Sequence, residues 1–282
     1  MKLIVEAGAT KSDWRLVEKG PRELRRLLTD GMNISTMGSA AVCKVVREGL
    51  CALGVDVPEE GYEGVYIYMA GEMDPECRGE LEKTVRDVAK VGEIELRDDM
   101  VGAARAACQR EPGIAAIMGT GSNACFYDGE KLVQKVYSGG FILGDYGSGA
   151  VLGKRFVSDY LKGLVPEEIA AEFRAEFGGE YGDIVNNVYR SGSPSKYLGS
   201  FAPFIMSHYD NPYVKALADG NFQDFIDTSL KVYDTSRYSV GVVGGFAYAN
   251  RDIFGAIAAE NGIKISRFIP APIEGLTEYH CI

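Results

Sequence analysis

The feature that most constrains the fold is a plan of three strands that occurs twice along the chain. Each copy begins with an apolar run that ends in a turn of small residues, and two more strand-like segments follow. The first copy occupies residues 2–29, and the second comprises IAAIMGT (114–120), NACFYDG (123–129) and KLVQKVY (131–137). Helical segments follow in both halves, and strands that alternate with helices predict layered α/β domains. The two copies share this pattern with negligible letter-by-letter identity.

The spacing of apolar residues predicts the other elements. In the first half we expect helices at 38–53, 75–90 and 101–108, and strands at 64–71 and 93–99. In the second half we expect helical segments over about 148–235, a strand at 239–246, a helix to about Asn261, a strand at 263–269 and a closing helix at 273–282.

The restart of the pattern near Pro112-Gly113 predicts two lobes. We expect an N-terminal lobe of residues 1–112, joined by the helix 273–282, and a C-terminal lobe of residues 113–272. A chain of 282 residues is long enough for two domains that each have a core.

Composition and charge narrow the classes of function. Hydrophobic residues make up 46% of the chain and charged residues 25%, as in soluble globular proteins. The net charge of −10 and the pI near 4.9 disfavour nucleic acid and anionic membranes as partners. A small anion such as ATP is compatible, because backbone N–H groups and Mg²⁺ can bind it locally. The N-terminus reads as a strand instead of a signal peptide, and no apolar stretch approaches the roughly 20 residues of a membrane span. We therefore expect a cytoplasmic protein.

Cysteine and histidine usage argues against two kinds of site. None of the six cysteines lies in a CxxC motif, so we expect reduced thiols and no zinc or redox site. The chain has only two histidines, His208 and His280. If the protein is an enzyme, its general base is therefore expected to be a carboxylate.

Three glycine turns each follow an apolar strand: EAGATK (6–11), GTGSN (119–123) and GGFA (244–247). Glycine allows positive φ angles and a close approach of the backbone, so N–H groups can converge on an anion. The first turn alone could also be an ordinary hairpin. No GxxxxGK[ST] occurs, and no GxGxxG follows the first strand, which argues against a P-loop and a Rossmann dinucleotide site.

Two acids lie at positions where chemistry is plausible. Asp99 comes directly after the strand 93–97 and before a helix start, so it is either an N-cap or a base. Asp145 lies between two glycine clusters in GGFILGDYGSG (139–149). The apolar triplet 141–143 before it suggests a wall folded over a pocket.

Taken together, these segments resemble the N-acetylglucosamine kinase and BadF/BadG-type ATPase family of the actin/hexokinase/Hsp70 superfamily, over nearly the whole chain. The strongest match is the pair GTGSN (119–123) and GGFILGDYGSGAVLGK (139–154), in the order and spacing of the family. Four further segments resemble the first phosphate turn, the sugar loop, the catalytic D-x-x-G and the adenosine turn: LIVEAGATKSDW (3–14), DGMN (30–33), DDMVG (98–102) and VGVVGGFA (240–247).

The resemblance implies a fold of two ribonuclease H-like lobes, the actin-like ATPase fold, with ATP and sugar in a cleft between them. It implies an ATP-dependent kinase of an amino sugar, with N-acetylglucosamine and its 6-phosphate as substrate and product. Asp99 would take the proton from the sugar 6-hydroxyl. Mg²⁺ would bridge phosphate oxygens with Glu6 or its waters. Phosphoryl transfer depends on such alignment and charge neutralisation.

The resemblance also implies ligand contacts. The phosphate and adenosine contacts would come from Gly8, Ala9, Thr10, Lys11, Gly119, Thr120, Gly121, Gly244 and Gly245. The sugar contacts would come from Asn33, Asn123, Gly140 and Asp145. Simpler interpretations remain open for Asn33 as a turn former and for Lys11 as a solvated lysine. Trp14, the only tryptophan, is expected to pack in the core.

Two positions depart from the family pattern. Glu6 stands where the family usually has Asp, which moves the carboxylate by one methylene although Mg²⁺ requires near-ideal octahedral distances. Tyr146 stands where the family motif G-D-E-G-S has Glu, which affects the expected selectivity for the sugar.

Two other classes of function remain open. One is an ATPase activator of a 2-hydroxyacyl-CoA dehydratase type system, whose relatives hold an iron–sulfur cluster between subunits. The cysteines of this chain lack the glycine-flanked context of such a cluster. The other is a non-catalytic sugar or nucleotide sensor, suggested by Glu6 and Tyr146. The expected partners are a small-molecule sugar and ATP, without nucleic acid or membrane, and a homodimer is left open.

Overall fold

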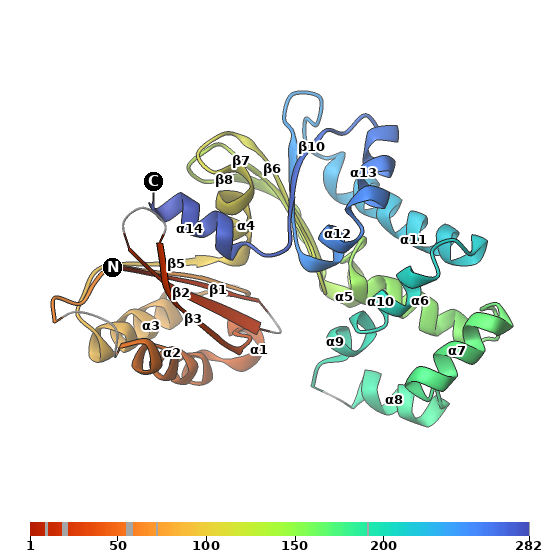
Figure 1. Ribbon diagram of the computed structural model, residues 1–282, viewed down its shortest axis with the longest axis horizontal. Coiled ribbons are helices and arrows are strands. Elements are labelled where there is room, and N and C mark those ends of the chain that lie inside the picture. Colours follow the sequence, from red (N-terminus) through yellow and green to blue (C-terminus); the bar gives the residue numbers. More distant parts are fainter. Residues whose placement is uncertain (9–10, 19–21, 55–58, 72, 191, 282) are drawn as a thin grey trace. The chain divides into compact units, whose positions relative to one another are not determined.

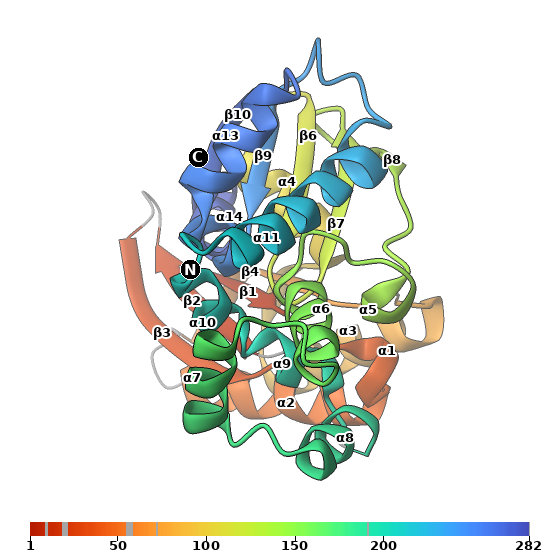
Figure 2. The same ribbon diagram turned by 90° about the vertical axis from the view of Figure 1, so that its right-hand side faces the viewer.

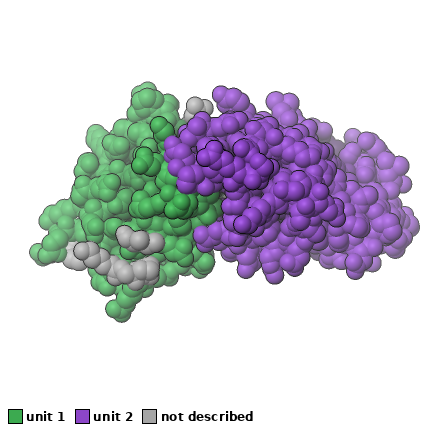
Figure 3. Space-filling view, turned by 90° about the horizontal axis from the view of Figure 1, so that it is seen from above, with its two compact units in different colours: residues 1–111, 129–131, 271–282 green, residues 112–128, 132–270 purple. Residues whose placement is uncertain are grey.

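The computed structural model describes residues 1–8, 11–18, 22–54, 59–71, 73–190 and 192–281 (Figure 1). The chain divides into two compact units, which Figure 3 distinguishes by colour. Unit 1 comprises residues 1–111, 129–131 and 271–282, and unit 2 comprises residues 112–128 and 132–270. Each unit contains one five-stranded mixed sheet in its described residues.

The sheet of unit 1 has the strand order β3-β2-β1-β4-β5. The first three strands form an antiparallel meander, and β1, β4 and β5 run parallel. Their bounds are β1 Lys2–Ala7, β2 Lys11–Glu18, β3 Arg22–Asp30, β4 Tyr62–Met69 and β5 Val91–Asp98.

The two faces of this sheet carry different side chains. Leu3, Val5 and Ala7 alternate along β1 and are fully buried in a core that includes α2 (Ser39–Leu53) and α3 (Pro75–Val88). Trp14 is also fully buried there, as expected from the sequence. The helices α4 (Asp99–Cys108) and α14 (Ile273–Cys281) cover the opposite face (Figure 1).

The sheet of unit 2 has the strand order β10-β9-β6-β7-β8, with β6, β9 and β10 parallel and β7 and β8 antiparallel to their neighbours. The helices α11 and α13 cover one face of it (Figure 2), and their phenylalanines pack on the aliphatic residues of β6 and β9. The strand bounds are β6 Gly113–Met118, β7 Ser122–Tyr127, β8 Leu132–Lys135, β9 Val240–Val243 and β10 Ile265–Ile269.

The helices of unit 2 build a second apolar cluster, centred on the fully buried Phe156 and Phe173. The helix bounds are α5 Gly140–Leu143, α6 Gly149–Tyr160, α7 Glu167–Phe177, α8 Tyr181–Tyr189, α9 Pro194–Gly199, α10 Ala202–Ser207, α11 Pro212–Phe225, α12 Gly245–Ala249 and α13 Arg251–Glu260, with a π-turn at Ile226–Leu230.

The predicted strands and long helices are confirmed to within a few residues, as is the layered α/β fold with two lobes. Two short helices were not predicted, α1 (Ile34–Met37) and α5. The triplet 141–143, expected to form a wall over a pocket, lies on α5, where Ile142 and Leu143 are 71% and 80% exposed. The wall itself stays a prediction. Among the described residues, no helix combines the length and apolar character that a membrane span requires.

Candidate functional site

The carboxyl ends of β1, β4 and β5 meet at one edge of the unit 1 sheet, where parallel strands commonly present ligand-binding groups. Glu6 lies near the end of β1, and Asp99 directly follows β5. Asn33 lies at the same edge, because it forms a parallel bridge with Ala70, just past β4. The fold thus gathers three predicted site residues that are up to 93 positions apart in sequence.

Glu6 is an acid in an unfavourable environment for its charge. The pKa of its carboxyl group is raised to about 7, mainly by burial, with smaller contributions from the carboxylates of Asp13 and Asp99, while the charge of Lys11 opposes the shift. The shift shows that Asp99 lies close enough to Glu6 for their charges to interact. A cation would stabilise the ionised form of Glu6 at this position.

Asp13 is a residue of this site that the sequence reading did not select. It pairs with Glu6 across β1 and β2 and is only 3% exposed. Its carboxylate accepts hydrogen bonds from Arg15 and Arg26, with the shortest contacts at 2.8 and 2.6 Å. Two guanidinium groups therefore neutralise Asp13, so its charge is compensated beside Glu6. The hairpin register alone could have indicated this pairing.

Asp99 is the first residue of α4, and the structure separates the two interpretations that the sequence left open for it. The N-cap is the preceding residue, Asp98, whose Oδ1 accepts a hydrogen bond from the backbone N–H of Val101 at 2.8 Å. Asp99 is partly buried and lies in the first helical turn, where the helix dipole favours a negative charge. The N-cap position therefore belongs to Asp98, and Asp99 is the first helical residue.

Asn33 serves as the N-cap of α1, since its Oδ1 accepts a hydrogen bond from Ser35 N–H at 3.0 Å. The backbone of Gly71 lies directly beside this cap. A Cβ at Gly71, whose φ is +94°, would lie 2.7 Å from both Asn33 Oδ1 and Ser35 Oγ. The local fold thus holds Asn33 in place through its amide oxygen.

The first glycine turn is described only at its two ends. Gly8 N–H donates to Lys11 C=O at 3.0 Å, which closes the turn between β1 and β2. The predicted phosphate ligands Ala9 and Thr10 lie outside the described residues. Lys11 is exposed, and its charge acts on Glu6.

In unit 2, the second glycine turn lies at the carboxyl end of β6. Gly119 N–H donates to Gly121 C=O at 2.9 Å, which makes the turn tight. The first N–H groups of α6, from Gly149 and Ala150, donate to the carbonyls of Gly119 and Thr120 at 2.9 and 3.2 Å. The N-terminus of α6 therefore fixes the turn in place.

The third glycine turn packs against the second. Gly244 follows β9, which is parallel to β6, and has a φ of +134°. A Cβ on Gly244 would lie 2.4 Å from Met118 O and 3.1 Å from Gly119 N. No atom lies within 4 Å of the position that a Cβ on Gly245 would occupy, so the space beside this residue is open. Unit 2 thus brings together the two predicted nucleotide turns at one sheet edge.

Asp145 joins this group of residues through Gly121. Its Oδ2 would lie 2.9 Å from a Cβ on Gly121, so the Asp145 carboxylate lies directly beside the turn. Burial raises the pKa of Asp145 to about 6, against the opposing effects of a hydrogen bond from the Ser122 backbone and the charge of Lys154. Asp145 also has a φ of +53°, an uncommon conformation for a residue other than glycine.

Side chains hold the loop that carries Asp145. Asn221 is fully buried, and it accepts a hydrogen bond from Gly147 N–H at 3.1 Å and donates to Ser148 C=O at 3.2 Å. Ser122 Oγ donates to Tyr146 C=O at 2.6 Å. Asn221 could not be predicted as a support of this loop, because it lies 74 residues from Gly147 in an ordinary helical segment.

The surroundings of Asn123 and Gly140, the other two sugar ligands predicted in unit 2, indicate a binding role less clearly than those of Asp145. Asn123 lies in β7, and its Oδ1 accepts a hydrogen bond from the N–H of the next residue, Ala124, at 2.9 Å. Gly140 is exposed at the start of α5 with a φ of +66°. Both belong to unit 2, with Asp145 and the two nucleotide turns, whereas Glu6, Asn33 and Asp99 belong to unit 1.

Known proteins resemble the chain in sequence and in fold, although no family model matches it. The structure of the "Putative N-acetylglucosamine Kinase" from Porphyromonas gingivalis is 35% identical, with a TM-score of 0.94, and the match covers 100% of this chain and 99% of that one. The N-acetylmuramic acid/N-acetylglucosamine kinase of Clostridium acetobutylicum is 27% identical over 218 residues, or 73% of this chain and 69% of that protein.

A more distant structure shows how widely the fold is shared. The ROK family glucokinase of Streptomyces griseus, solved with glucose and AMPPNP, has a TM-score of 0.58 at 15% identity and is matched over 98% of both chains. At this identity the likeness concerns the fold alone. The match to the Porphyromonas gingivalis protein extends over essentially both full chains at 35% identity. The chain therefore belongs to the N-acetylglucosamine kinase family.

Proposed function

We propose that this protein transfers the γ-phosphoryl group of ATP to the 6-hydroxyl of an amino sugar, with N-acetylglucosamine as the substrate. The observation that carries the proposal is the placement of Asp99. It is a carboxylate at the carboxyl edge of a parallel sheet, it directly follows the N-cap residue Asp98, and it interacts with a second acid, Glu6. The names of two relatives support the choice of sugar.

Asp99 would act as the general base. It would accept the proton of the 6-hydroxyl while the sugar oxygen forms a bond to the γ-phosphorus and the bond from that phosphorus to the bridging oxygen of ADP breaks. General bases of this kind contribute roughly 10²–10⁴-fold to the rate. The remaining barrier is lowered by alignment of the two substrates and by neutralisation of phosphate charge.

The phosphate groups would be held by backbone N–H groups. In unit 2 these would come from Thr120, Gly121 and Gly245, while Gly119, whose N–H donates to Gly121 C=O, would keep the turn tight. In unit 1 we assign the same role to Ala9, Thr10 and Lys11, while Gly8, whose N–H donates to Lys11 C=O, would close the turn. Gly244 would also have a structural role, because the lack of a side chain lets the third glycine turn contact the second.

The acids of unit 1 fit a magnesium ion that arrives with ATP. In the described part of the chain no three His, Cys, Asp or Glu residues form a group that could hold a metal alone. Mg²⁺ usually takes only one or two carboxylates and completes its octahedron with phosphate oxygens and waters. Glu6 would hold the ion in this way, and the bound ion would neutralise phosphate charge.

The sugar would be oriented by hydrogen bonds to its hydroxyl groups. Asp145 is suited to this role, because burial destabilises its ionised carboxylate and a hydrogen bond donated by a sugar hydroxyl would stabilise it. Asn33, Asn123 and Gly140 complete the proposed sugar contacts.

A coupled assay of ADP release tests the proposal. Mg-ATP would be presented with N-acetylglucosamine, glucosamine, N-acetylmuramic acid and glucose in turn. We expect the highest kcat/KM with N-acetylglucosamine. The matched variants are Asp99→Asn, which removes the base, and Asp98→Asn, which removes a charge one residue away and keeps a good N-cap.

The expected result is a loss of about 10²–10⁴-fold in kcat for Asp99→Asn, with little change for Asp98→Asn. If no sugar stimulates turnover by the unmodified protein, the kinase proposal is wrong. Sugar-independent release of inorganic phosphate would favour the ATPase activator instead, and binding of sugar without turnover would favour the sensor.

A further inference from the structure

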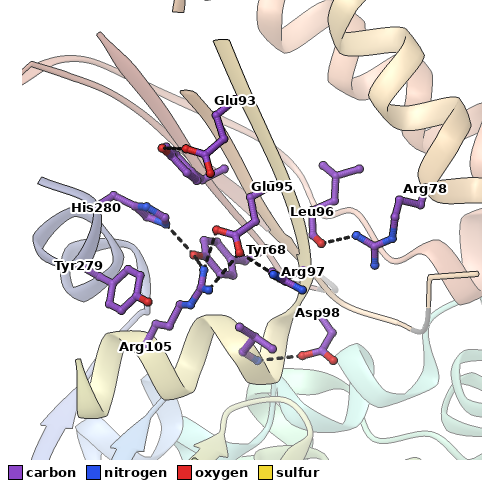
Figure 4. Close-up of polar contacts among 12 residues, drawn as sticks. Tyr68, Arg78, Glu93, Glu95, Leu96, Arg97, Asp98, Arg105, Tyr279 and His280 are labelled. Carbon is purple, nitrogen blue, oxygen red and sulfur yellow. Dashed lines mark hydrogen bonds and ion pairs between the residues drawn. The ribbon is translucent and has the colours of Figure 1, made fainter. Parts of the chain in front are cut away.

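The polar face of the unit 1 sheet carries a buried network that centres on Arg105 of α4 (Figure 4). Arg105 is 7% exposed, and its two terminal nitrogens bind the carboxylate of Glu95 in a bidentate pair at 2.8 and 3.0 Å. The same guanidinium group donates to the hydroxyl of Tyr68 at 2.7 Å. One helical side chain is thus tied to both β4 and β5.

The Tyr68 hydroxyl continues the network to the C-terminal helix. It accepts a hydrogen bond from Arg105 and forms a second hydrogen bond with His280 Nε2 at 2.6 Å. Burial and the charge of Arg105 lower the pKa of His280 to about 3, so the ring is neutral. The His280 ring also stacks on Tyr66 with centroids 3.8 Å apart.

The C-terminal helix α14 adds further contacts to Arg105 and to the rest of α4. The Tyr279 ring lies 4.8 Å from the guanidinium carbon of Arg105, within the range of a cation–π contact. Gln109 Nε2 donates to Gly275 C=O at 3.0 Å, and a Cβ at Gly275 would lie 2.5 Å from Ala106 O. The two helices therefore pack backbone to backbone, and α4 has no room to shift toward α14.

This network surrounds the junction at which β5 turns into α4, and Asp99 lies at that junction. The strand β5 leads into α4 at Asp98 and Asp99, with Glu95 four residues before Asp99 and Arg105 six residues after it. Six residues of helix span about 9 Å. The Glu95–Arg105 pair thus ties the two arms of the corner together, and Asp99 lies at its apex. The angle between strand and helix decides where the Asp99 carboxylate lies.

We propose that Arg105 is the positioning residue for Asp99: by binding Glu95 and Tyr68 it fixes the β5–α4 corner and, with it, the location of the Asp99 carboxylate. The proposal deepens the kinase function proposed above, on which the kinetic part of its test rests. A planar guanidinium is required, because a lysine ammonium cannot form the bidentate pair and reach Tyr68 at once. A displacement of about 1 Å in a reacting group can cost roughly 10²-fold in rate.

The test compares Arg105→Lys with Arg97→Lys as a matched control. Arg97 donates to the same Glu95 carboxylate at 2.8 Å, but it lies on β5 itself, is 48% exposed and does not tie the helix to the strand. We expect Arg105→Lys to lower kcat by about 10-fold to 10²-fold with KM values for sugar and ATP within twofold. Arg97→Lys should leave all three parameters within twofold of the unmodified protein.

A double variant separates positioning from general loss of structure. If Arg105 acts through Asp99, Arg105→Lys should not lower the residual rate of Asp99→Asn any further. Tyr68→Phe gives a second probe that keeps the Glu95–Arg105 pair and removes one hydroxyl, and it should lower kcat by a few fold. The proposal is overturned if Arg105→Lys behaves like Arg97→Lys, or lowers the Asp99→Asn rate by its full factor. If Arg105→Lys does not fold, an unchanged kcat for Tyr68→Phe overturns it.

A spectroscopic readout is independent of turnover. The ¹³C carboxyl resonance of Asp99, assigned by its loss in Asp99→Asn, should shift or broaden in Arg105→Lys and remain unchanged in Arg97→Lys. A resonance that is identical in both variants contradicts the proposal even if no sugar is turned over. An unmodified protein without sugar-dependent activity contradicts the kinase function alone, so the two failures are distinguishable.

Discussion

The contact between the second and third glycine turns, both in unit 2, gives a sharp prediction for Gly244→Ala. The new Cβ would lie 2.4 Å from Met118 O and 2.7 Å from Met118 C, which are backbone atoms of the neighbouring strand and cannot move aside alone. The φ of +134° adds strain for any residue with a Cβ, about 1–3 kcal/mol. Overpacking adds about 1–3 kcal/mol. We expect a loss of about 2–6 kcal/mol in the free energy of unfolding of unit 2.

Gly245→Ala is the matched control. It changes the next residue, which begins α12, has no atom within 4 Å of its Cβ position and has no positive φ. Alanine in place of glycine in a helix is expected to stabilise by about 0.5–1 kcal/mol. The two adjacent glycines should therefore respond in opposite directions.

Urea unfolding with two spectroscopic probes measures the effect. Circular dichroism at 222 nm follows mainly unit 2, which contains most of the helices, whereas the fluorescence of the single Trp14 reports on unit 1. With a slope of about 2–3 kcal/mol per M, the dichroism midpoint of Gly244→Ala should fall by roughly 1 M or more. A midpoint within 0.2 M of the unmodified protein, or an equal fall for Gly245→Ala, would refute the reasoning.

Three other changes have expected outcomes. Asp99→Asn should lower kcat by about 10²–10⁴-fold while the dissociation constant for N-acetylglucosamine, measured by calorimetry, changes little; full activity would exclude Asp99 as the base. The pKa of Glu6 is raised from 4.5 to about 7, so the folded state favours the protonated carboxyl group. The stabilisation that this group contributes below pH 4.5 is therefore lost as the pH rises to about 7. Glu6→Gln should remove this pH dependence, which amounts to about 3 kcal/mol in the free energy of unfolding between pH 4.5 and 8, measured with urea and without Mg-ATP. Parallel pH profiles for the two proteins would contradict this prediction. Asn221→Ala removes the acceptor of the buried Gly147 N–H and one of the hydrogen bonds to Ser148 C=O, which still accepts from Leu152 N–H. This change should lower stability by about 1–3 kcal/mol and raise the KM for sugar, whereas an unchanged KM would mean that the loop does not need this support.

The sequence was sufficient for features that depend on local pattern. The alternation of Leu3, Val5 and Ala7 predicts a strand with one buried face, and the structure has this strand. The capping of α3 by Asp74, followed by Pro75 in the first turn, is similarly local and agrees with the helix predicted from Pro75. Neighbouring residues alone determine these elements, so reading along the chain finds them.

Features that depend on pairing across the fold could not be read in this way. The sequence offers Asp98 and Asp99 as adjacent acids, and only the backbone geometry decides that Asp98 caps the helix. The triplet 141–143 is apolar, yet it forms a short helix with two exposed side chains, because apolar character alone does not specify burial. The link between Arg105 and Glu95 spans two elements, and an Arg and a Glu ten residues apart give no signal of a bidentate pair.

The most direct test of the central claim is a ³¹P NMR time course with the unmodified protein, Mg-ATP and N-acetylglucosamine. A sugar kinase that uses the 6-hydroxyl should convert the γ-phosphate signal of ATP into a phosphomonoester signal split by the two protons on C6, with one ADP formed for each phosphomonoester. A spectrum that shows only inorganic phosphate and ADP, or no loss of ATP, would contradict the proposed function.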